Sequence, residues 1–218
     1  MRLIDLSHPI EHGMVTYKGL PAPVICDHLT FEASRALYEG GEEFSIARID
    51  MVANTGTYID VPAHRWRDGD DLAAVVLERV ADLPGLCVDA TGADGPALGP
   101  ELFEGLELAD HAVLVRTDWS RNWRTDAYFE DHPFLTEVAA TQLRDRGAAL
   151  VGIDSHNIDD TRVRTRPAHS VLLRAGVPIV EHMTNLAALP PKGFRFTAAP
   201  PKVRGMGTFP VRAMARIG

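Results

Sequence analysis

The segment ANTGTYIDVPAHRW, residues 53–66, gathers side chains that can bind a metal ion or move a proton. Because alternate side chains of an extended chain share a face, four residues are expected on one side: Asn54, Gly56, Tyr58 and Asp60. The glycine leaves room there for an ion, a water molecule or a substrate. Pro62 ends the strand, and His64 follows on a bend from which it can reach back toward Asp60.

Two later segments can complete a site. In RPAHS, residues 166–170, His169 stands at the start of a helical turn. In VPIVEHMTNL, residues 177–186, Glu181 ends an apolar strand, where a carboxylate without a partner is costly. The plainer alternative is that His169 is structural, and that Tyr58 and Asp60 are surface groups on an edge strand.

The elements that must position these residues alternate between strand and helix. Apolar runs of strand length are RLIDLS, FSIARIDMVA, GLCVDAT, HAVLVRTD, AALVGID and VPIVEHM. The clearest helix is FLTEVAATQLRDRG (134–147), where one face is expected to hold Leu135, Val138, Ala139 and Leu143. Shorter helical segments are expected at 71–80 and 169–176. Strand–helix alternation over 111–183 indicates an α/β fold, and 190–207 is expected to be a loop-rich wrap.

Composition narrows the class of protein. The chain has 218 residues, of which 45% are apolar, and this predicts one domain over 1–218 with a sizeable core. A net charge of −8 argues against nucleic acid as a partner. No leading hydrophobic segment and no membrane-length apolar run is present. Two distant cysteines, Cys26 and Cys87, have no metal-type spacing. We therefore expect a cytoplasmic protein that binds a small molecule and no membrane.

Several motifs resemble those of the Putative cyclase family, which includes bacterial kynurenine formamidase and isatin hydrolase. They are IDLSHPI, NTGTYIDVPAH, GIDSHNID and RPAHSVLLRAGVPIVEHMTNL, and they stand in the family's order over nearly the whole chain. The resemblance implies the swivelling β/β/α fold, with mixed sheets and a few helices. It also implies a hydrolase that assembles as a homodimer or a higher homo-oligomer.

The family pattern resembles His-x-Gly-Thr-His-x-Asp-x-Pro-x-His, and this chain departs from it at two places. Asn54 and Tyr58 stand where the pattern has its first two histidines. In formamidase-like members those histidines and the Asp hold one metal. The resemblance implies that Asp60, His169 and Glu181 hold the other metal, and that His64 transfers protons.

The two substitutions change the expected chemistry. An Asn oxygen is a poor ligand for Zn²⁺, and a phenol with a pKa of about 10 rarely ligates. We therefore expect one divalent ion, Zn or Mn, and no second metal. That ion can activate water while His64 carries the proton, and Tyr58 can donate to a developing oxyanion. Asn54, Tyr17 and His156 are expected to bind substrate.

Other polar residues leave alternatives open. His156 can replace a lost ligand, and His182 can do so less readily because it should face away from Glu181. The segment TRVRTR, residues 161–166, has arginines at every second position. We interpret it as a solvated edge strand, with carboxylate recognition beside His169 as the other reading.

Three functions are compatible with these residues. The favoured one is a hydrolase of an arylformamide, lactam or lactone that uses metal-activated water and His64. The second is a metal-independent cyclase or isomerase of small-molecule or polyketide-type metabolism, in which His64, Tyr58 and Asp60 supply acid–base chemistry. The third is a non-catalytic binder that has kept only the pocket.

Overall fold

A computed structural model describes all 218 residues and shows one large mixed sheet. Its nine strands, in spatial order, are β1 (Arg2–Asp5), β13 (Met214–Ile217), β11 (Lys192–Thr197), β5 (Leu83–Asp89), β7 (Ala112–Arg116), β9 (Leu150–Ile153), β10 (Ile179–Glu181), β4 (Tyr58–Asp60) and β12 (Thr208–Pro210). The strands β5, β7, β9 and β10 run parallel, and their neighbours run antiparallel. The predicted α/β class is therefore confirmed.

The remaining elements are short. The α-helices are α1 (Phe31–Arg35), α2 (Glu137–Asp145) and α3 (Pro167–Arg174), and the small strands are β2 (Val24–Leu29), β3 (Ile46–Asp50), β6 (Ala97–Leu98) and β8 (Phe134–Leu135). Single 3-10 turns are η1 (Pro62–His64), η2 (Leu77–Arg79), η3 (Pro100–Phe103), η4 (Trp119–Asn122), η5 (Asp126–Phe129) and η6 (Leu186–Ala188). None of the helices combines the length and apolar character needed to cross a bilayer.

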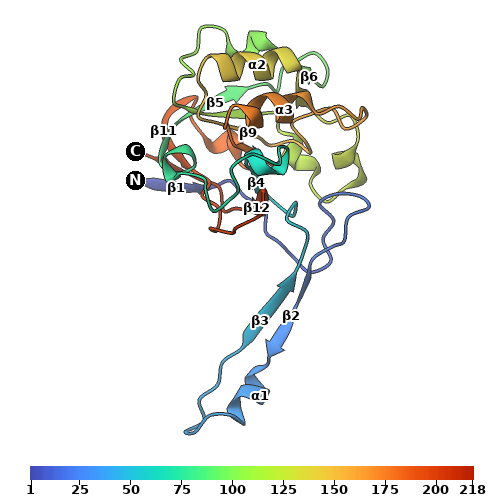
Figure 1. The fold of residues 1–218 in the computed structure, drawn as a ribbon, viewed down its shortest axis with the longest axis vertical. Coiled ribbons are helices and arrows are strands. Elements are labelled where there is room, and N and C mark those ends of the chain that lie inside the picture. The colour runs from blue at the N-terminus through green and yellow to red at the C-terminus, as the bar shows by residue number, and fades with distance from the viewer.

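Apolar residues pack on both faces of the sheet. One core lies where α2 and α3 cover β5, β7 and β9 (Figure 1), and it includes Val113, Val151 and Leu172. The second core lies on the opposite face and includes Leu114, Val180 and Phe196. Burial on both faces explains why the central strands read as continuous apolar runs rather than alternating ones.

Helix α2 begins at Glu137 and not at the predicted residue 134, because Phe134 and Leu135 form β8. The Thr136 hydroxyl caps the helix by accepting a bond from the Ala139 N–H at 3.2 Å. The predicted apolar face is wrong at Val138, which is 62% exposed. Ala140 is buried in its place, so the helix contacts the sheet through Ala139, Ala140 and Leu143. An alanine gives little indication in the sequence of whether it is buried. The predicted face therefore included the larger Val138 in place of Ala140.

The expectations for two less regular segments have different outcomes. Residues 71–80, expected as a short helix or helical turn, form turns that include the 3-10 turn η2 and no α-helix. The stretch 190–207 is not a loop-rich wrap throughout, since β11 lies inside the sheet between β13 and β5. Phe194 and Phe196 on this strand are buried, as aromatic side chains of an interior strand should be.

A long arm leaves the body of the molecule (Figure 1). It consists of β2, α1 and β3, with β2 and β3 paired as an antiparallel hairpin. Every residue of β3 is exposed, and so is almost all of β2. The arm therefore has no apolar core of its own.

The pairing of β4 places the chemistry-bearing residues. This strand lies between β10 and β12 and is fully buried, so Tyr58 and Asp60 are not surface groups of an edge strand. Its register sets Tyr58 opposite Glu181 on β10, and Asp60 opposite Thr208 on β12. Three segments far apart in the sequence thus meet at one point of the sheet.

Candidate active site

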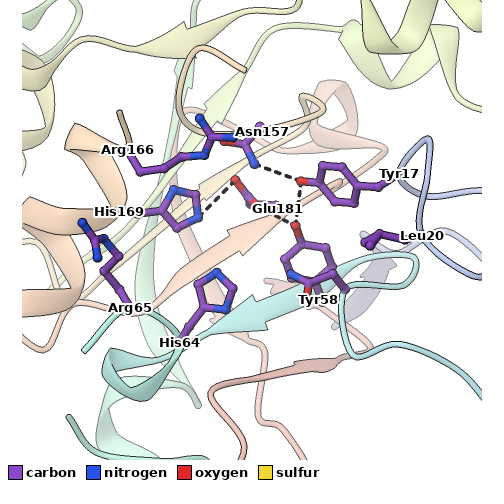
Figure 2. Close-up of a pocket in the computed structure, with 10 residues that line it drawn as sticks. Tyr17, Leu20, Tyr58, His64, Arg65, Asn157, Arg166, His169 and Glu181 are labelled. Carbon is purple, nitrogen blue, oxygen red and sulfur yellow. Dashed lines mark hydrogen bonds and ion pairs between the residues drawn. The ribbon is translucent and has the colours of Figure 1, made fainter. Parts of the chain in front are cut away.

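An open cavity of about 550 Å³ lies beside β4 and the start of α3 (Figure 2). It is lined by Tyr17, Leu20, Asn54, Tyr58, His64, Arg65, Asn157, Arg166, His169 and Glu181. Six of these ten were predicted site residues. No role was predicted for Leu20, Arg65 or Asn157. Arg166 was considered only as part of TRVRTR, with carboxylate recognition as the alternative reading of that segment.

Glu181 is held by neighbours on both oxygens. The Tyr58 hydroxyl donates to Glu181 Oε2 at 2.6 Å, and the Ile158 N–H donates to Oε1 at 2.6 Å. Burial raises the pKa of the Glu181 carboxyl to about 7, with the charge of Asp60 adding to the effect and His169 opposing it. Because Tyr58 gives its only proton to Glu181, it orients that carboxylate and has no proton left for an oxyanion.

Tyr17 extends this hydrogen-bonded group from the N-terminal loop. Its hydroxyl lies 2.8 Å from that of Tyr58 and accepts a bond from Asn157 Nδ2 at 2.9 Å. Burial, followed by the negative charge of Glu181, raises the pKa of both tyrosines well above the usual value. Both side chains are therefore neutral phenols.

His64 and Asp60 are connected through Thr208. The Thr208 hydroxyl donates to Asp60 Oδ1 and lies 2.6 Å from His64 Nδ1. Since the carboxylate takes the only hydroxyl proton, Thr208 must accept from an Nδ1–H of His64. His64 Nε2 is then the unprotonated nitrogen. Burial lowers the pKa of His64 and outweighs the opposite effect of Asp60. The ring is therefore neutral, and its Nε2 can accept a proton.

Gly207 permits this approach of β12. A Cβ on Gly207 would lie 2.1 Å from the backbone nitrogen of His64, so no larger residue fits without moving the chain. The Gly207 carbonyl also accepts from the Val61 N–H at 2.8 Å. Thr208 is thus placed by backbone contacts, and its role cannot be inferred from its residue type.

His169 is fixed by Asp159 at the N-terminus of α3. The Asp159 carboxylate accepts bonds from the Ala168 and His169 N–H groups and lies 2.6 Å from His169 Nδ1. Although burial acts to lower it, Glu181, Asp159 and Asp60 together raise the pKa of His169 to about 10. With that pKa and no ion bound, the other ring nitrogen, Nε2, also carries a proton and faces Asp60 and Glu181. Figure 2 shows Nε2 directed at Glu181. A bound ion would take the place of that proton.

These atoms form a site that suits a cation. His169 Nε2 lies 3.4 Å from Asp60 Oδ2 and 3.8 Å from Glu181 Oε1. Asp60 Oδ2 is buried and has no hydrogen-bond partner, which is costly for a carboxylate oxygen. Ligand atoms of Asp60, His64 and His169 all lie within 4.8 Å of one another. A divalent ion would satisfy the unpartnered oxygen, and imidazole with carboxylates is a donor set that suits Zn²⁺ and Mn²⁺.

His156 and His182 lie outside the cavity. The backbone carbonyl of His156 accepts from the Tyr17 hydroxyl at 3.0 Å, but its ring packs between Tyr128 and Phe129. His182 Nδ1 lies 2.9 Å from the Tyr128 hydroxyl. Neither histidine belongs to the group that can hold an ion. They form a wall behind the tyrosines rather than replacing the two missing ligands.

Comparisons with known proteins agree with this geometry. The Putative cyclase family model matches residues 4–160. A kynurenine formamidase of Salinibacter ruber is 28% identical over 219 residues, which cover 99% of this chain and 98% of that protein.

Solved structures extend the comparison. A "potential metal-dependent hydrolase with cyclase activity" superposes with a TM-score of 0.76 at 27% identity, covering 98% of each chain. Isatin hydrolase A from Labrenzia aggregata, solved with benzyl benzoate, superposes with a TM-score of 0.83 at 24% identity, covering 99% of this chain and 93% of that one. The second likeness concerns the fold alone. The chain belongs to the Putative cyclase family and is an enzyme of that family.

Proposed function

We propose that this enzyme is a hydrolase that opens the carbon–nitrogen or ester bond of an arylformamide, lactam or lactone of a small metabolite. The observation that carries the proposal is the buried Asp60 Oδ2, which accepts no hydrogen bond and lies 3.4 Å from His169 Nε2. Through Thr208 the same carboxylate also orients His64. The hydrolase names of the similar proteins support this class of reaction.

The cation site consists of Asp60, His169 and Glu181, with one ion, Zn²⁺ or Mn²⁺. Bound there, such an ion lowers the pKa of water and polarises a carbonyl group. A second ion is not expected, because Asn54 and the neutral Tyr58 replace two histidine ligands of the family pattern. Asp159 keeps His169 Nδ1 occupied and so leaves Nε2 for the ion.

His64 moves the proton. Its Nε2 takes a proton from the attacking water as the new carbon–oxygen bond forms. The same nitrogen returns that proton to the leaving nitrogen or oxygen as the original bond breaks. Asn54 lines the cavity, and its amide makes no hydrogen bond within the protein. It is therefore available to donate to the substrate carbonyl oxygen.

The test combines metal content with hydrolysis. The protein is purified without added metal or a metal-affinity tag, analysed for metals, and assayed with formanilide, an aryl lactam and an aryl lactone. We expect about one Zn or Mn per chain, its loss in Asp60→Asn, and hydrolysis of at least one compound. Absence of metal even after dialysis against divalent ions, or metal without hydrolysis of any compound, would sink the proposal.

The role of His64 is tested separately, because its ring nitrogen also lies close to Asp60 and His169. If His64 carries the proton, the His64→Ala variant should keep the ion and lose about 10²- to 10⁴-fold in kcat. If His64 is instead a metal ligand, the same variant should lose the ion as well. Glu181→Gln provides the matched comparison, since it should lower metal content.

A further inference from the structure

Two arginine side chains line the same cavity as His64 and His169. Arg65 follows η1, and Arg166 immediately precedes α3. Figure 2 shows both arginines on the His169 side of the cavity, with Tyr17 and Leu20 on the opposite side. The cavity thus has a basic side and a side formed by phenol and aliphatic groups.

Both arginines are held in place by the protein. Arg166 Nη1 donates to the carbonyl oxygens of Val163 at 2.9 Å and Thr165 at 3.0 Å. Arg65 Nε donates to Ser170 Oγ at 3.2 Å, and that hydroxyl donates to the Arg166 carbonyl at 2.6 Å. One serine therefore links the two residues. These bonds leave several guanidinium N–H groups without a protein acceptor.

Neither cavity arginine forms an ion pair, although their neighbours do. Arg162 pairs with Asp160 at 2.9 Å and with Asp131 at 3.0 Å, and Arg174 pairs with Asp68 at 2.9 Å. Acidic residues outnumber Lys and Arg in this chain by 30 to 22, so acidic partners are not scarce. Two cations that line one cavity without an ion-paired carboxylate indicate that the anion comes from the ligand.

The segment 161–166 also bears on this interpretation. It forms turns and no strand, so the edge-strand reading of its arginines is wrong. Two arginines of this segment have different surroundings: Arg162 forms surface ion pairs, and Arg166 lines the cavity.

We propose that Arg65 and Arg166 form a carboxylate-binding subsite, so that the enzyme's substrate is an aryl or apolar acid carrying the scissile bond. This inference rests on the proposed hydrolytic function for the reaction, but not for the binding of the acid. The guanidinium forks match a planar carboxylate. The apolar part of the ligand then lies toward Leu20 and Tyr17.

The test compares the binding of phenylacetate and phenylacetamide, a charged and a neutral ligand of nearly equal shape, by titration calorimetry on the protein as purified. We expect phenylacetate to bind at least about 10-fold more tightly, the effect of one charge-assisted hydrogen bond. The preference should fall to near unity in Arg65→Met and in Arg166→Met. Arg67→Met, an exposed arginine outside the cavity, is the matched control and should keep the preference.

Equal binding of the two ligands, or no binding of phenylacetate, would overturn the subsite. A preference that survives in Arg65→Met would also overturn it, because the carboxylate would then bind elsewhere, such as at the cation. Arg65→Met is the decisive variant, since Arg166 also supports a loop. Because the assay needs no turnover, failure of hydrolysis with the acid preference intact would overturn the proposed function alone.

Discussion

Thr208 shows how one hydroxyl can decide the protonation of a catalytic candidate. It donates to Asp60 and accepts from His64, which leaves His64 Nε2 unprotonated. The same hydroxyl connects the proposed metal ligand Asp60 to the proposed proton carrier His64. Removing it should therefore disturb proton transfer more than folding or metal binding.

We predict that Thr208→Val lowers kcat/KM about 10-fold or more with an unchanged metal content, because His64 loses the group that fixes its tautomer. Thr208→Ser, which keeps the hydroxyl, should restore most of the rate. Rates are measured over a range of pH, and the Val variant should show an altered profile. A Val variant with the rate and pH profile of the native enzyme would contradict the assignment of the tautomer.

At this scale the sequence predicted candidate residues better than it predicted their contacts. Glu181 was indicated by the cost of an unpaired carboxylate at a strand end, and Asp60 and His64 by the spacing of the strand and the bend. The ligand set that includes His169 was implied by the family resemblance. Their grouping around one cavity follows from strand register, which fixes Tyr58 against Glu181. Thr208, Arg65 and Asp159 were missed because each acts through a neighbour from a distant segment.

Asp159 has two roles at once, because its carboxylate caps the N-terminus of α3 and also orients the ring of His169. We predict that Asp159→Asn lowers metal affinity about 10- to 100-fold, because the imidazole loses its carboxylate partner. It should also destabilise the fold by about 1–3 kcal/mol, because the Asn amide nitrogen cannot accept the bonds that the second carboxylate oxygen accepts, and a buried N–H group loses its partner. Metal-binding titration and urea unfolding measure the two effects.

Asp160→Asn is the matched control for that change. Asp160 adjoins Asp159 but pairs with the exposed Arg162, so its loss should alter metal affinity little. Equal effects of the two substitutions on metal affinity would show that Asp159 does not act through His169.

The aromatic wall formed by His156, Tyr128 and Phe129 predicts a dependence of stability on pH. Burial lowers the pKa of His156 to about 3, far below its ordinary value of about 6.5. In the unfolded chain His156 therefore binds a proton below about pH 6.5, whereas in the folded chain it does so only near pH 3. Stability supplied by the neutral ring is present above pH 6.5 and is lost as the pH falls through that window.

We predict that the fall in Tm between pH 7 and pH 5 is smaller in His156→Phe than in the native chain. Phenylalanine keeps the packing and removes the titrating ring. His28→Phe, at an exposed position of the arm, should leave the fall unchanged. An equal fall in all three proteins would mean that His156 does not contribute to the acid sensitivity.

The strands that are buried on both faces of the sheet could be predicted from the sequence. Parallel strands are covered on both faces, so β5, β7, β9 and β10 appear as short continuous apolar runs, which are typical of buried strands. Prediction failed for β11, whose Lys, Gly and Arg residues resemble a loop although its Phe residues are buried. It also failed for the extent of β4, since the chain pairs only over Tyr58–Asp60.

The arm of β2, α1 and β3 raises the question of assembly at the scale of the whole molecule. It exposes many large apolar side chains: Val24, Ile25, Phe31, Leu37, Tyr38, Phe44, Ile46 and Ile49. A lone two-stranded hairpin is marginally stable in water, and a patch of this kind on a free surface favours association. We propose that the arm packs against a second copy of this chain, in a homodimer or higher homo-oligomer.

We predict that the native chain sediments as a dimer or larger and that Leu37→Ser combined with Tyr38→Ser and Phe44→Ser shifts it toward the monomer. These three side chains lie at the far part of the arm, so the body should keep its fold, which circular dichroism checks. Val76→Ser with Leu77→Ser, an exposed apolar pair on the body, is the control and should leave assembly unchanged. A native monomer at micromolar concentration would contradict the proposal. Because the arm has no core, its apolar side chains would then require another partner to cover them.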